Sequence, residues 1–362
     1  MFLLVCGLYL VMSCFGSAYA AQGMDYSIWK LQGPLVNTEA MSSDQLVNQS
    51  AYFAYWAKDA AYDTFMSPSK GYATPGASHC RTELREMLPN GKTNAAWSQA
   101  GYHVMTATYR VKQLGTGSAT TGQGSIVIGQ VWSDGNGMVE LAYKPKTSSH
   151  VGSFAVKEAG GTWKYIDSIS IPLLTDFNVK YQINENVLKI YIKTANTANF
   201  SEAPHFTQVL NGTYYFKCGN YDQSAGVITS GTVSTTPYSV VEISSIDVLH
   251  NPISGSLTYS NGDPVIDQTV MLTLNGGGVS NLTKTVKTDA NGNYMIKNIP
   301  SSNGSSVASV TITPPAIAGY TLNRSNWAVA SVVANTVKGV RTGYDFVYSP
   351  AKYTVTFNSN GG

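Results

Sequence analysis

The chain has 362 residues, enough for two domains, and 43% of them are apolar, so substantial cores can form. Charged residues make up only 12%, while Tyr (23) and Gly (34) are frequent, which is typical of an all-β extracellular protein and unlike a helical cytoplasmic enzyme. The net charge of +2 excludes global steering of a polyanion, so an acidic substrate must be attracted by a local basic cluster.

The N-terminus has the pattern of an export signal over residues 1–20. An apolar run over residues 2–16 is too short to span a membrane, and Ala18-Tyr19-Ala20 supplies the small residues that signal peptidase requires. Cys14 lies close to this site and leaves lipoprotein anchoring as a minor alternative. We therefore expect a secreted or cell-surface bacterial protein without a membrane span.

Residues 24–249 contain one predicted strand after another. The clearest cover residues 125–132, 138–143, 179–183 and 188–192, and the last two form a hairpin through Asn184-Glu185-Asn186. Only residues 43–63 have helical character. Many short strands over this length predict one large antiparallel sandwich, a β-jelly roll.

A second unit is predicted over residues 253–349, where Asn261-Gly262-Asp263-Pro264 is a strong turn. It resembles the carboxypeptidase-regulatory-like and Cna-B-like modules of bacterial surface proteins, which implies a smaller immunoglobulin-like β-sandwich acting as a spacer. Residues 350–362 resemble the opening strand of a Listeria–Bacteroides-type repeat. We expect this strand to begin a further, truncated repeat.

Three segments of the first unit place polar side chains on one face of a strand, because alternate residues share a face. The segments are Arg81-Thr82-Glu83-Leu84-Arg85, Gln130-Val131-Trp132 and residues 215–223. The residues that share a face are Arg81, Glu83 and Arg85, then Gln130 and Trp132, then Tyr215, Lys217, Tyr221 and Gln223. A charged strand face is usually only solvated, but packed side by side these strands would form a groove floor rich in Arg, Lys, Gln and Tyr.

Together the segments resemble the three motifs of polysaccharide lyase family 7, the alginate lyases with a β-jelly-roll fold. These motifs are Arg-Ser/Thr-Glu-Leu-Arg, Gln-Ile/Val-His and Tyr-Phe-Lys-Ala-Gly-x-Tyr-x-Gln. The first and third match here in order, with Cys218 in place of Ala, and Trp29-Lys30-Leu31-Gln32 is similar to the family's opening strand. The resemblance covers residues 25–249.

The resemblance implies cleavage of a uronate polymer by β-elimination. Removing the C5 proton is difficult while the adjacent carboxylate is negative, so positive and hydrogen-bonding groups must stabilise the developing charge. By resemblance Arg81 and Gln130 do this, and Tyr221 protonates the departing oxygen with a pKa that neighbouring Arg and Lys are expected to lower. Glu83 would hold the arginines. Substrate-binding roles are implied for Glu83, Arg85, Lys217, Gln223, Trp132 and His79.

The partner that we expect is thus an acidic polysaccharide. No metal, cofactor or nucleic acid is expected, and the protein is expected to be a monomer.

Trp132 stands where the family has a catalytic histidine. In the family that histidine helps neutralise the carboxylate and is the base for guluronate, whose C5 proton and C4 oxygen lie on opposite faces. In mannuronate and glucuronate they lie on the same face, so Tyr221 alone can take one proton and deliver one. We therefore expect mannuronate-rich alginate as the substrate, with glucuronan or another glucuronate polymer as the alternative.

Two nearby residues each have two interpretations. His79 shares the face of Arg81 and either replaces the missing imidazole or is a surface histidine, which we favour. Trp132 either stacks against a sugar ring or fills the space that a histidine would leave.

Cys80 and Cys218 are the cysteines left after the signal, and alternation points both into the core. A disulfide between them and two buried free thiols are both open.

Other functions are a non-catalytic polysaccharide-binding module, a jelly-roll glycoside hydrolase and a structural surface protein. A hydrolase needs two carboxylates that flank the scissile bond, but Glu83 sits between arginines and Asp222 faces away. Retention of Tyr221 argues against a mere binder, and a structural role leaves the first unit unexplained.

Overall fold

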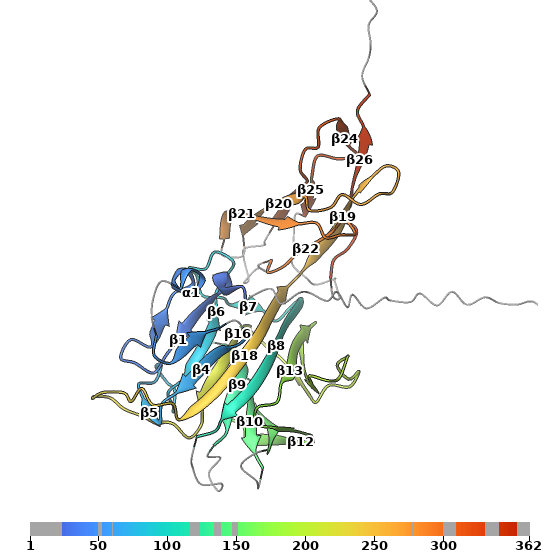
Figure 1. The fold of residues 1–362 in the computed structure, drawn as a ribbon. Coiled ribbons are helices and arrows are strands. Elements are labelled where there is room, and N and C mark those ends of the chain that lie inside the picture. The colour runs from blue at the N-terminus through green and yellow to red at the C-terminus, as the bar shows by residue number, and fades with distance from the viewer. Residues whose placement is uncertain are drawn as a thin grey trace, which may run out of the picture.

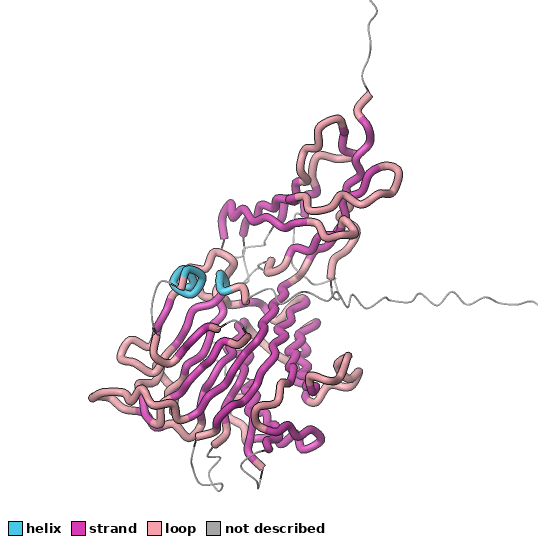
Figure 2. The backbone as a smooth tube through the Cα atoms, in the orientation of Figure 1, coloured by secondary structure: helices cyan, strands magenta, loops and turns pink. Residues whose placement is uncertain are grey.

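The structure is a computed structural model that describes residues 24–49, 53–59, 61–115, 124–133, 139–146, 151–276, 279–299, 309–329 and 340–352. The predicted signal, Cys14 and residues 353–362 of the predicted repeat lie outside these residues. Helix occurs in the described residues only in the 3₁₀ turn η1 (Tyr26–Ile28) and in α1 (Ser43–Asn48). Figure 2 shows how small this helical share is, and the all-β prediction is confirmed.

The helix α1 is shorter than the stretch predicted over residues 43–63. Ser42 caps its N-terminus in a capping box with Gln45, and Gln49 ends it with a left-handed φ of 48°. The chain then forms β3 (Trp56–Lys58) and enters β4 (Asp63–Ser67). The helical prediction was wrong there because aromatic side chains such as Trp56 pack into the sandwich core, and tertiary packing overrides local propensity.

The strands between residues 29 and 250 form two antiparallel sheets that pack face to face, as expected for a jelly-roll sandwich (Figure 1). Among the described residues the first sheet has nine strands. Eight of them run in the order β12 (Trp163–Pro172), β11 (Val151–Lys157), β10 (Val139–Pro145), β9 (Ile126–Trp132), β16 (Thr213–Asp222), β6 (Thr82–Glu86), β1 (Trp29–Gln32), β2 (Glu39–Met41), and β7 (Trp97–Ser98) pairs with β16.

The second sheet has seven strands in the described part of the chain. They run in the order β15 (Phe206–Val209), β14 (Val187–Thr194), β13 (Phe177–Asn184), β8 (Tyr102–Gln113), β18 (Ser239–His250), β4, β3. A short parallel pair joins β17 (Gly226–Val227) to β5 (Lys70–Gly71). The predicted hairpin is present as β13 and β14, with Glu185 and Asn186 at positive φ in its turn.

Large apolar side chains fill the space between the two sheets. Phe177 of β13 lies within 5.2 to 6.1 Å, between ring centroids, of Tyr109, Tyr143 and Phe154, which come from β8, β10 and β11. All four are fully buried. Since each such side chain contributes about 1.5–3 kcal/mol when buried, these contacts join the two sheets.

The two central strands of the first sheet are buried on both faces. Every residue of β6 is buried, and so is β16 from Tyr214 to Asp222. Leu84 and Phe216 face the core, so the opposite face of these strands is covered by other side chains. That opposite face carries the polar residues of the sequence motifs.

Residues 253–350 form two further sheets, each with four strands within the described ranges. One runs in the order β22 (Asn293–Ile296), β19 (Ile253–Tyr259), β26 (Phe346–Pro350), β24 (Tyr320–Leu322), and the other β21 (Val279–Lys287), β20 (Thr269–Gly276), β23 (Ser309–Thr313), β25 (Trp327–Val329). Figure 1 shows β18 leading into β19. The immunoglobulin-like assignment stays a prediction.

A buried polar network lies beneath the central strands. The carboxylate of Glu86 accepts hydrogen bonds from Trp97 Nε1 at 2.7 Å, from Phe216 N at 2.9 Å, and bonds to His250 Nε2 at 2.6 Å. His250 Nδ1 lies 2.7 Å from His103 Nδ1, and His103 Nε2 donates to the Ala100 carbonyl. Burial lowers the pKa of His103 to about 3, so His103 is neutral and accepts at Nδ1. Sequence motifs gave no indication of this network.

We predict that Glu86→Ala destabilises the fold strongly. It leaves donors on Trp97, Phe216 and His250 without a partner in the interior, which costs about 3–5 kcal/mol for a broken buried pair. Urea unfolding followed by tryptophan fluorescence measures the loss. Glu158→Ala is the control, because Glu158 pairs with Lys164 at the surface and such a pair contributes about 0–1 kcal/mol. Equal losses in the two variants would contradict the prediction.

Candidate active site

The outer face of the first sheet carries a row of polar side chains that crosses the sheet from β1 to β12. Cross-strand partners share a face. Successive partners in this row are Lys30, Arg85, Lys217, Gln130, Glu140, Lys157 and Trp163. We call this row, together with Arg81, Glu83 and Tyr221, the polar face. It brings together residues from all three sequence motifs.

Glu83 is the centre of the polar face. It is fully buried, and it accepts from Arg81 Nη1 at 3.1 Å, Lys217 Nζ at 2.6 Å and Gln130 Nε2 at 2.5 Å. Burial raises the pKa of Glu83, but the charges of Lys217 and Arg81 outweigh it and hold the pKa below its usual value. Glu83 is therefore an ionised carboxylate that fixes two cations and one amide.

Lys217 is a buried cation of this group. Burial, together with the charge of Arg81, lowers its pKa to about 8, while Glu83 acts in the opposite direction. Arg85 is buried beside it, donates from Nη1 to the Glu86 carbonyl at 2.9 Å and stacks 3.8 Å above the Tyr215 ring.

Tyr221 lies directly against Arg81. The guanidinium carbon is 3.8 Å from the centre of the phenol ring, and only 6% of Tyr221 is exposed. The sequence predicted a lowered pKa for Tyr221, and this was wrong. Burial raises its pKa, Glu140 and Glu83 raise it further, and Arg81 only partly opposes them. Tyr221 is therefore a protonated phenol at neutral pH.

A β-bulge in β9 places Val127 against Tyr221. The register shifts at Ile128 and Gly129 against both neighbouring strands, so that Val127 faces the same side as Gln130 although the two are three positions apart. Val127 is then opposite Tyr221 and Ala142, and these three form a small apolar cluster. A Cβ at Gly129 would lie 2.4 Å from the Tyr181 hydroxyl, so the packing of the buried Tyr181 against β9 requires glycine there.

Gly219 lies between Lys217 and Tyr221 on β16 and has a φ of +147°. A Cβ there would lie 2.6 Å from the Thr82 carbonyl oxygen and 2.8 Å from the Glu83 Cα. The glycine of the third motif therefore allows β6 to approach β16 closely enough for Glu83 to reach its partners.

Three predicted substrate-binding residues lie around this centre. Trp132 is half-buried, pairs with Tyr215 across β9 and β16, and packs partly against the core. His79 donates from Nδ1 to the Ala225 carbonyl at 2.9 Å, and its ring centre is 6.0 Å from that of Tyr221. Gln223 follows β16 and donates to the carbonyl of Tyr221 at 3.3 Å.

The two cysteines are buried, as alternation predicted, but both are free thiols. Cys218 pairs with Leu84, and Cys80 precedes Leu84 by four residues. A strand rises about 3.3 Å per residue, so the two cysteines are roughly 13 Å apart, too far for a disulfide. The predicted alternative of a disulfide between Cys80 and Cys218 is therefore wrong.

Two buried polar atoms of the polar face have no hydrogen-bond partner among the described residues. They are Arg81 Nε, a donor, and Gln130 Oε1, an acceptor. Arg81 and Gln130 thus keep hydrogen-bonding capacity that no group of the described chain uses. The described ranges hold no group of three or more His, Cys, Asp or Glu side chains arranged for a metal, and no helix within them is long and apolar enough to cross a membrane.

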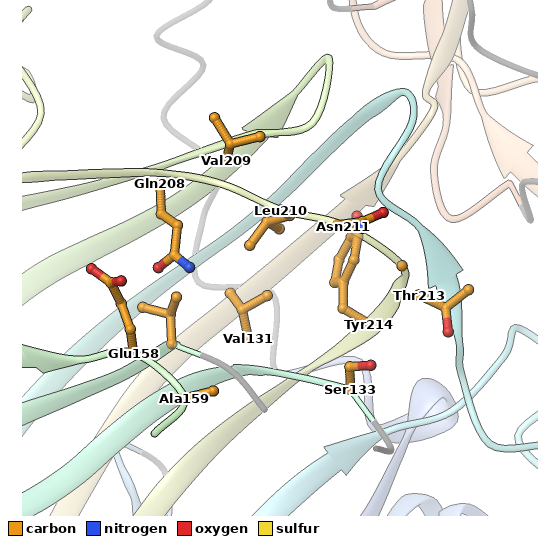
Figure 3. A pocket seen from close by; sticks show the side chains of 12 residues that line it. Val131, Ser133, Glu158, Ala159, Gln208, Val209, Leu210, Asn211, Thr213 and Tyr214 are labelled. Atoms are coloured by element: carbon orange, nitrogen blue, oxygen red, sulfur yellow. The ribbon is translucent and has the colours of Figure 1, made fainter. Parts of the chain in front are cut away.

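A separate pocket has a volume of about 390 Å³. Val131, Ser133, Gln208 and Tyr214 are among the residues that line it (Figure 3). None of the predicted site residues lines it. Val131 faces the core, whereas its neighbour Gln130 belongs to the polar face. The pocket and the polar face therefore lie on opposite sides of β9.

A family model described as alginate lyase matches residues 24–250, which contain the whole polar face. The chain belongs to the alginate lyase family. It is therefore a polysaccharide lyase acting on a uronate polymer. The motif resemblance and the family model agree on the same part of the chain.

Three solved alginate lyases are similar to this chain. The enzyme from Klebsiella pneumoniae is 17% identical with a TM-score of 0.51, covering 64% of this chain and 98% of its own. The enzyme from Corynebacterium sp. is 23% identical (64% and 98%, TM-score 0.49), and PA1167 from Pseudomonas aeruginosa is 22% identical (62% and 99%, TM-score 0.49). At such identity the first of these supports the shared fold only. No curated protein matches the chain.

The polar face of this alginate lyase family member also contains Glu140. None of the three sequence motifs includes this residue. It pairs with Gln130 on one side and Lys157 on the other. Burial raises its pKa, and Lys157 opposes this. The only sequence feature that could have indicated Glu140 is the alternation of residues 138–143, which places Glu140 and Ala142 on one face of the strand.

We predict that Glu140 makes uronate binding pH-dependent. As the pH rises above the elevated pKa of Glu140, the carboxyl group ionises and repels a bound uronate, so KM increases with pH. A repulsion of about 1 kcal/mol between charges near the surface corresponds to roughly fivefold in KM. Glu140→Gln should remove this increase and leave KM at the lower value, as measured by steady-state kinetics from acid to neutral pH.

Glu202→Gln is the matched control, because Glu202 is exposed and lies outside the polar face. A KM profile for Glu140→Gln that still rises in parallel with the parent would contradict the assignment.

Proposed function

We propose that this lyase cleaves mannuronate-rich alginate by β-elimination, with Tyr221 as both base and acid. The observation that carries the proposal is the stacking of Arg81 on Tyr221 at 3.8 Å, with Arg81 held by the buried Glu83. A uronate whose carboxylate binds Arg81 brings its C5 proton close to the phenol oxygen. No other tyrosine is stacked on Arg81 in the described residues.

The reaction begins at the uronate carboxylate. Arg81 Nε has a free N–H, and Gln130 retains one amide hydrogen after donating the other to Glu83. These donors stabilise the extra charge that develops on the carboxylate as the C5 proton leaves. Glu83 contributes by keeping both groups oriented, since they would otherwise be free to rotate.

Proton transfer is assigned to Tyr221. Its ionised form takes the C5 proton, the electron pair forms the C4–C5 double bond, and the C4–O bond breaks. The phenol then returns the proton to the departing glycosidic oxygen. This sequence requires the C5 proton and the C4 oxygen on the same face of the ring, as in mannuronate and glucuronate. Glucuronan is therefore the alternative substrate.

His79 is the alternative base. Its Nδ1–H donates to a carbonyl, which leaves Nε2 able to accept a proton. A non-catalytic binding domain is the second candidate function, favoured only by Trp132 at the position of the family's histidine. The polar face argues for catalysis, because a binder does not need a phenol packed under an arginine.

A hydrolase remains the weakest candidate. Glu83 and Glu140 both lie on the polar face, but Glu83 is fully buried and bonded to three groups, so it cannot serve as a free nucleophile or base.

For the rest of the chain, we propose that residues 1–20 are a signal that directs export. We propose that residues 253–349 act as a spacer.

We predict that Tyr221→Phe lowers kcat by at least a thousandfold, in the range lost with a general acid–base group. The measurement is the ultraviolet absorbance of the C4–C5 double bond conjugated to the carboxylate, with polymannuronate as substrate. Binding of polymannuronate to the variant, followed by affinity electrophoresis, should stay within about threefold of the parent, because the arginines and Lys217 remain.

His79→Asn accompanies this variant, since Asn keeps a donor for the Ala225 carbonyl. We expect it to lose less than tenfold in kcat. A loss as large as that of Tyr221→Phe would make His79 the base, and full activity of Tyr221→Phe would overturn the proposal.

We further predict that the parent prefers polymannuronate over polyguluronate, and that Trp132→His reduces this preference. Trp132 shares the polar face with Gln130, so an imidazole there can serve as the second base that guluronate requires. The ratio of polyguluronate to polymannuronate activity should increase at least tenfold. Equal activity of the parent on both homopolymers would contradict the assignment of Tyr221 as the sole proton-transfer group.

A further inference from the structure

The part of the polar face on β10, β11 and β12 differs from the part around Arg81. Two rows of cross-strand partners end there in aromatic side chains. Glu140 and Lys157 lead to Trp163, and Ala142 and Ala155 lead to Tyr165. The basic residues that bind Glu83 are on β16 and before β6, so the two ends of the polar face have different chemistry.

Trp163 lies over small side chains. Val127 and Ala142 are fully buried and form a cluster with Tyr221, and Trp163 packs against this cluster while remaining half-buried. Tyr165, beside it, is 57% exposed. A large half-buried ring that packs on this cluster from β12 is an apolar surface on the side of the cluster away from β16.

Two lysines accompany the two rings. Lys157 Nζ lies 5.8 Å from the centre of the Trp163 ring. Lys144 Nζ donates to the Tyr165 hydroxyl at 2.7 Å and lies 4.5 Å from the centre of its ring. Each aromatic ring therefore has an ammonium group at its edge or face, on an edge strand that no further strand of the described chain covers.

This combination matches the chemistry of a uronate ring. A sugar presents an apolar C–H face that stacks on an aromatic ring, and a uronate adds a carboxylate that an ammonium can bind. We propose that Trp163 and Tyr165, with Lys144 and Lys157, form an additional subsite that binds a uronate ring of the polymer remote from the bond that is cleaved. The inference rests on the proposed function, because it takes the polymer to be a polyuronate.

The position of the subsite gives it a dependence on chain length. β16 and β12 are separated by β9, β10 and β11, which at about 4.8 Å per strand is roughly 19 Å. A substrate that only spans the cleaved bond at Tyr221 does not reach this surface, whereas a longer chain does. Loss of the subsite should therefore affect long substrates and spare short ones.

The test compares Trp163→Ala with the parent on an oligomannuronate series from trisaccharide to octasaccharide. We expect kcat/KM to fall about tenfold for the longest substrates, chiefly through KM, and by less than twofold for the shortest that is cleaved. Trp163→Phe should retain most of the affinity because it keeps a stacking surface. Binding of the same series by Tyr221→Phe and by Tyr221→Phe/Trp163→Ala, measured by calorimetry, separates affinity from catalysis.

Trp327→Ala is the matched control. Trp327 is also half-buried on a strand and carries a cation 3.6 Å from its ring, Arg324, but lies in residues 253–350. The control should leave all substrates unaffected. A uniform loss at every chain length with a lowered melting temperature would assign Trp163 a packing role and overturn the subsite, as would unchanged binding of the octasaccharide.

The two proposals fail in different ways. If the parent releases no unsaturated product from any uronate polymer, the proposed function is wrong. If the parent is an active lyase but the length dependence is the same with and without Trp163, only the subsite is wrong.

Discussion

The polar face depends on one carboxylate that stays ionised where water does not reach it. Burying an unpaired charge costs several kcal/mol, so Glu83 requires partners in the interior of the sheet. It has them in Arg81, Lys217 and Gln130, which come from separate segments of the chain. Displacing any one of them leaves part of that charge uncompensated. The same electrostatic requirement that stabilises Glu83 therefore fixes the geometry of the groups that face the substrate.

In this arrangement Glu83 and Arg81 have different roles. Glu83 is bonded to three groups and only orients them, while Arg81, which we propose neutralises a bound carboxylate, covers the ring of Tyr221. Toward β12, lysines with aromatic rings take the place of the arginines. A polyanionic sugar needs both kinds of contact, because charge alone gives affinity for any anion, whereas ring stacking also requires a sugar face.

Sequence reasoning predicted the sandwich and the residues that gather on its outer face, because alternation along Arg81-Thr82-Glu83-Leu84-Arg85 and along β16 fixes which side chains share a face. It missed Glu140 and Trp163, since only the strand order brings them into line with Gln130. The bulge at Gly129 was equally hidden, because simple alternation puts Val127 and Gln130 on opposite faces. The pKa of Tyr221 was predicted in the wrong direction because the motif indicates its charged neighbours and not its burial.

The raised pKa of Tyr221 acts in opposite ways on its two proposed roles. As an acid toward the departing oxygen, the phenol is weakened by the raised pKa, because it gives up the proton taken from C5 less readily. As a base it is rarely ionised, but the rarer phenolate is the stronger base. For a substrate with both reacting positions on one face, the oxygen that takes the C5 proton also returns it, so each turnover restores the starting state. A substrate with the two positions on opposite faces needs a second base, and here the residue that follows Gln130 and Val131 is an indole. In the mechanism that we propose, the absence of that one imidazole makes ring stereochemistry the basis of substrate choice.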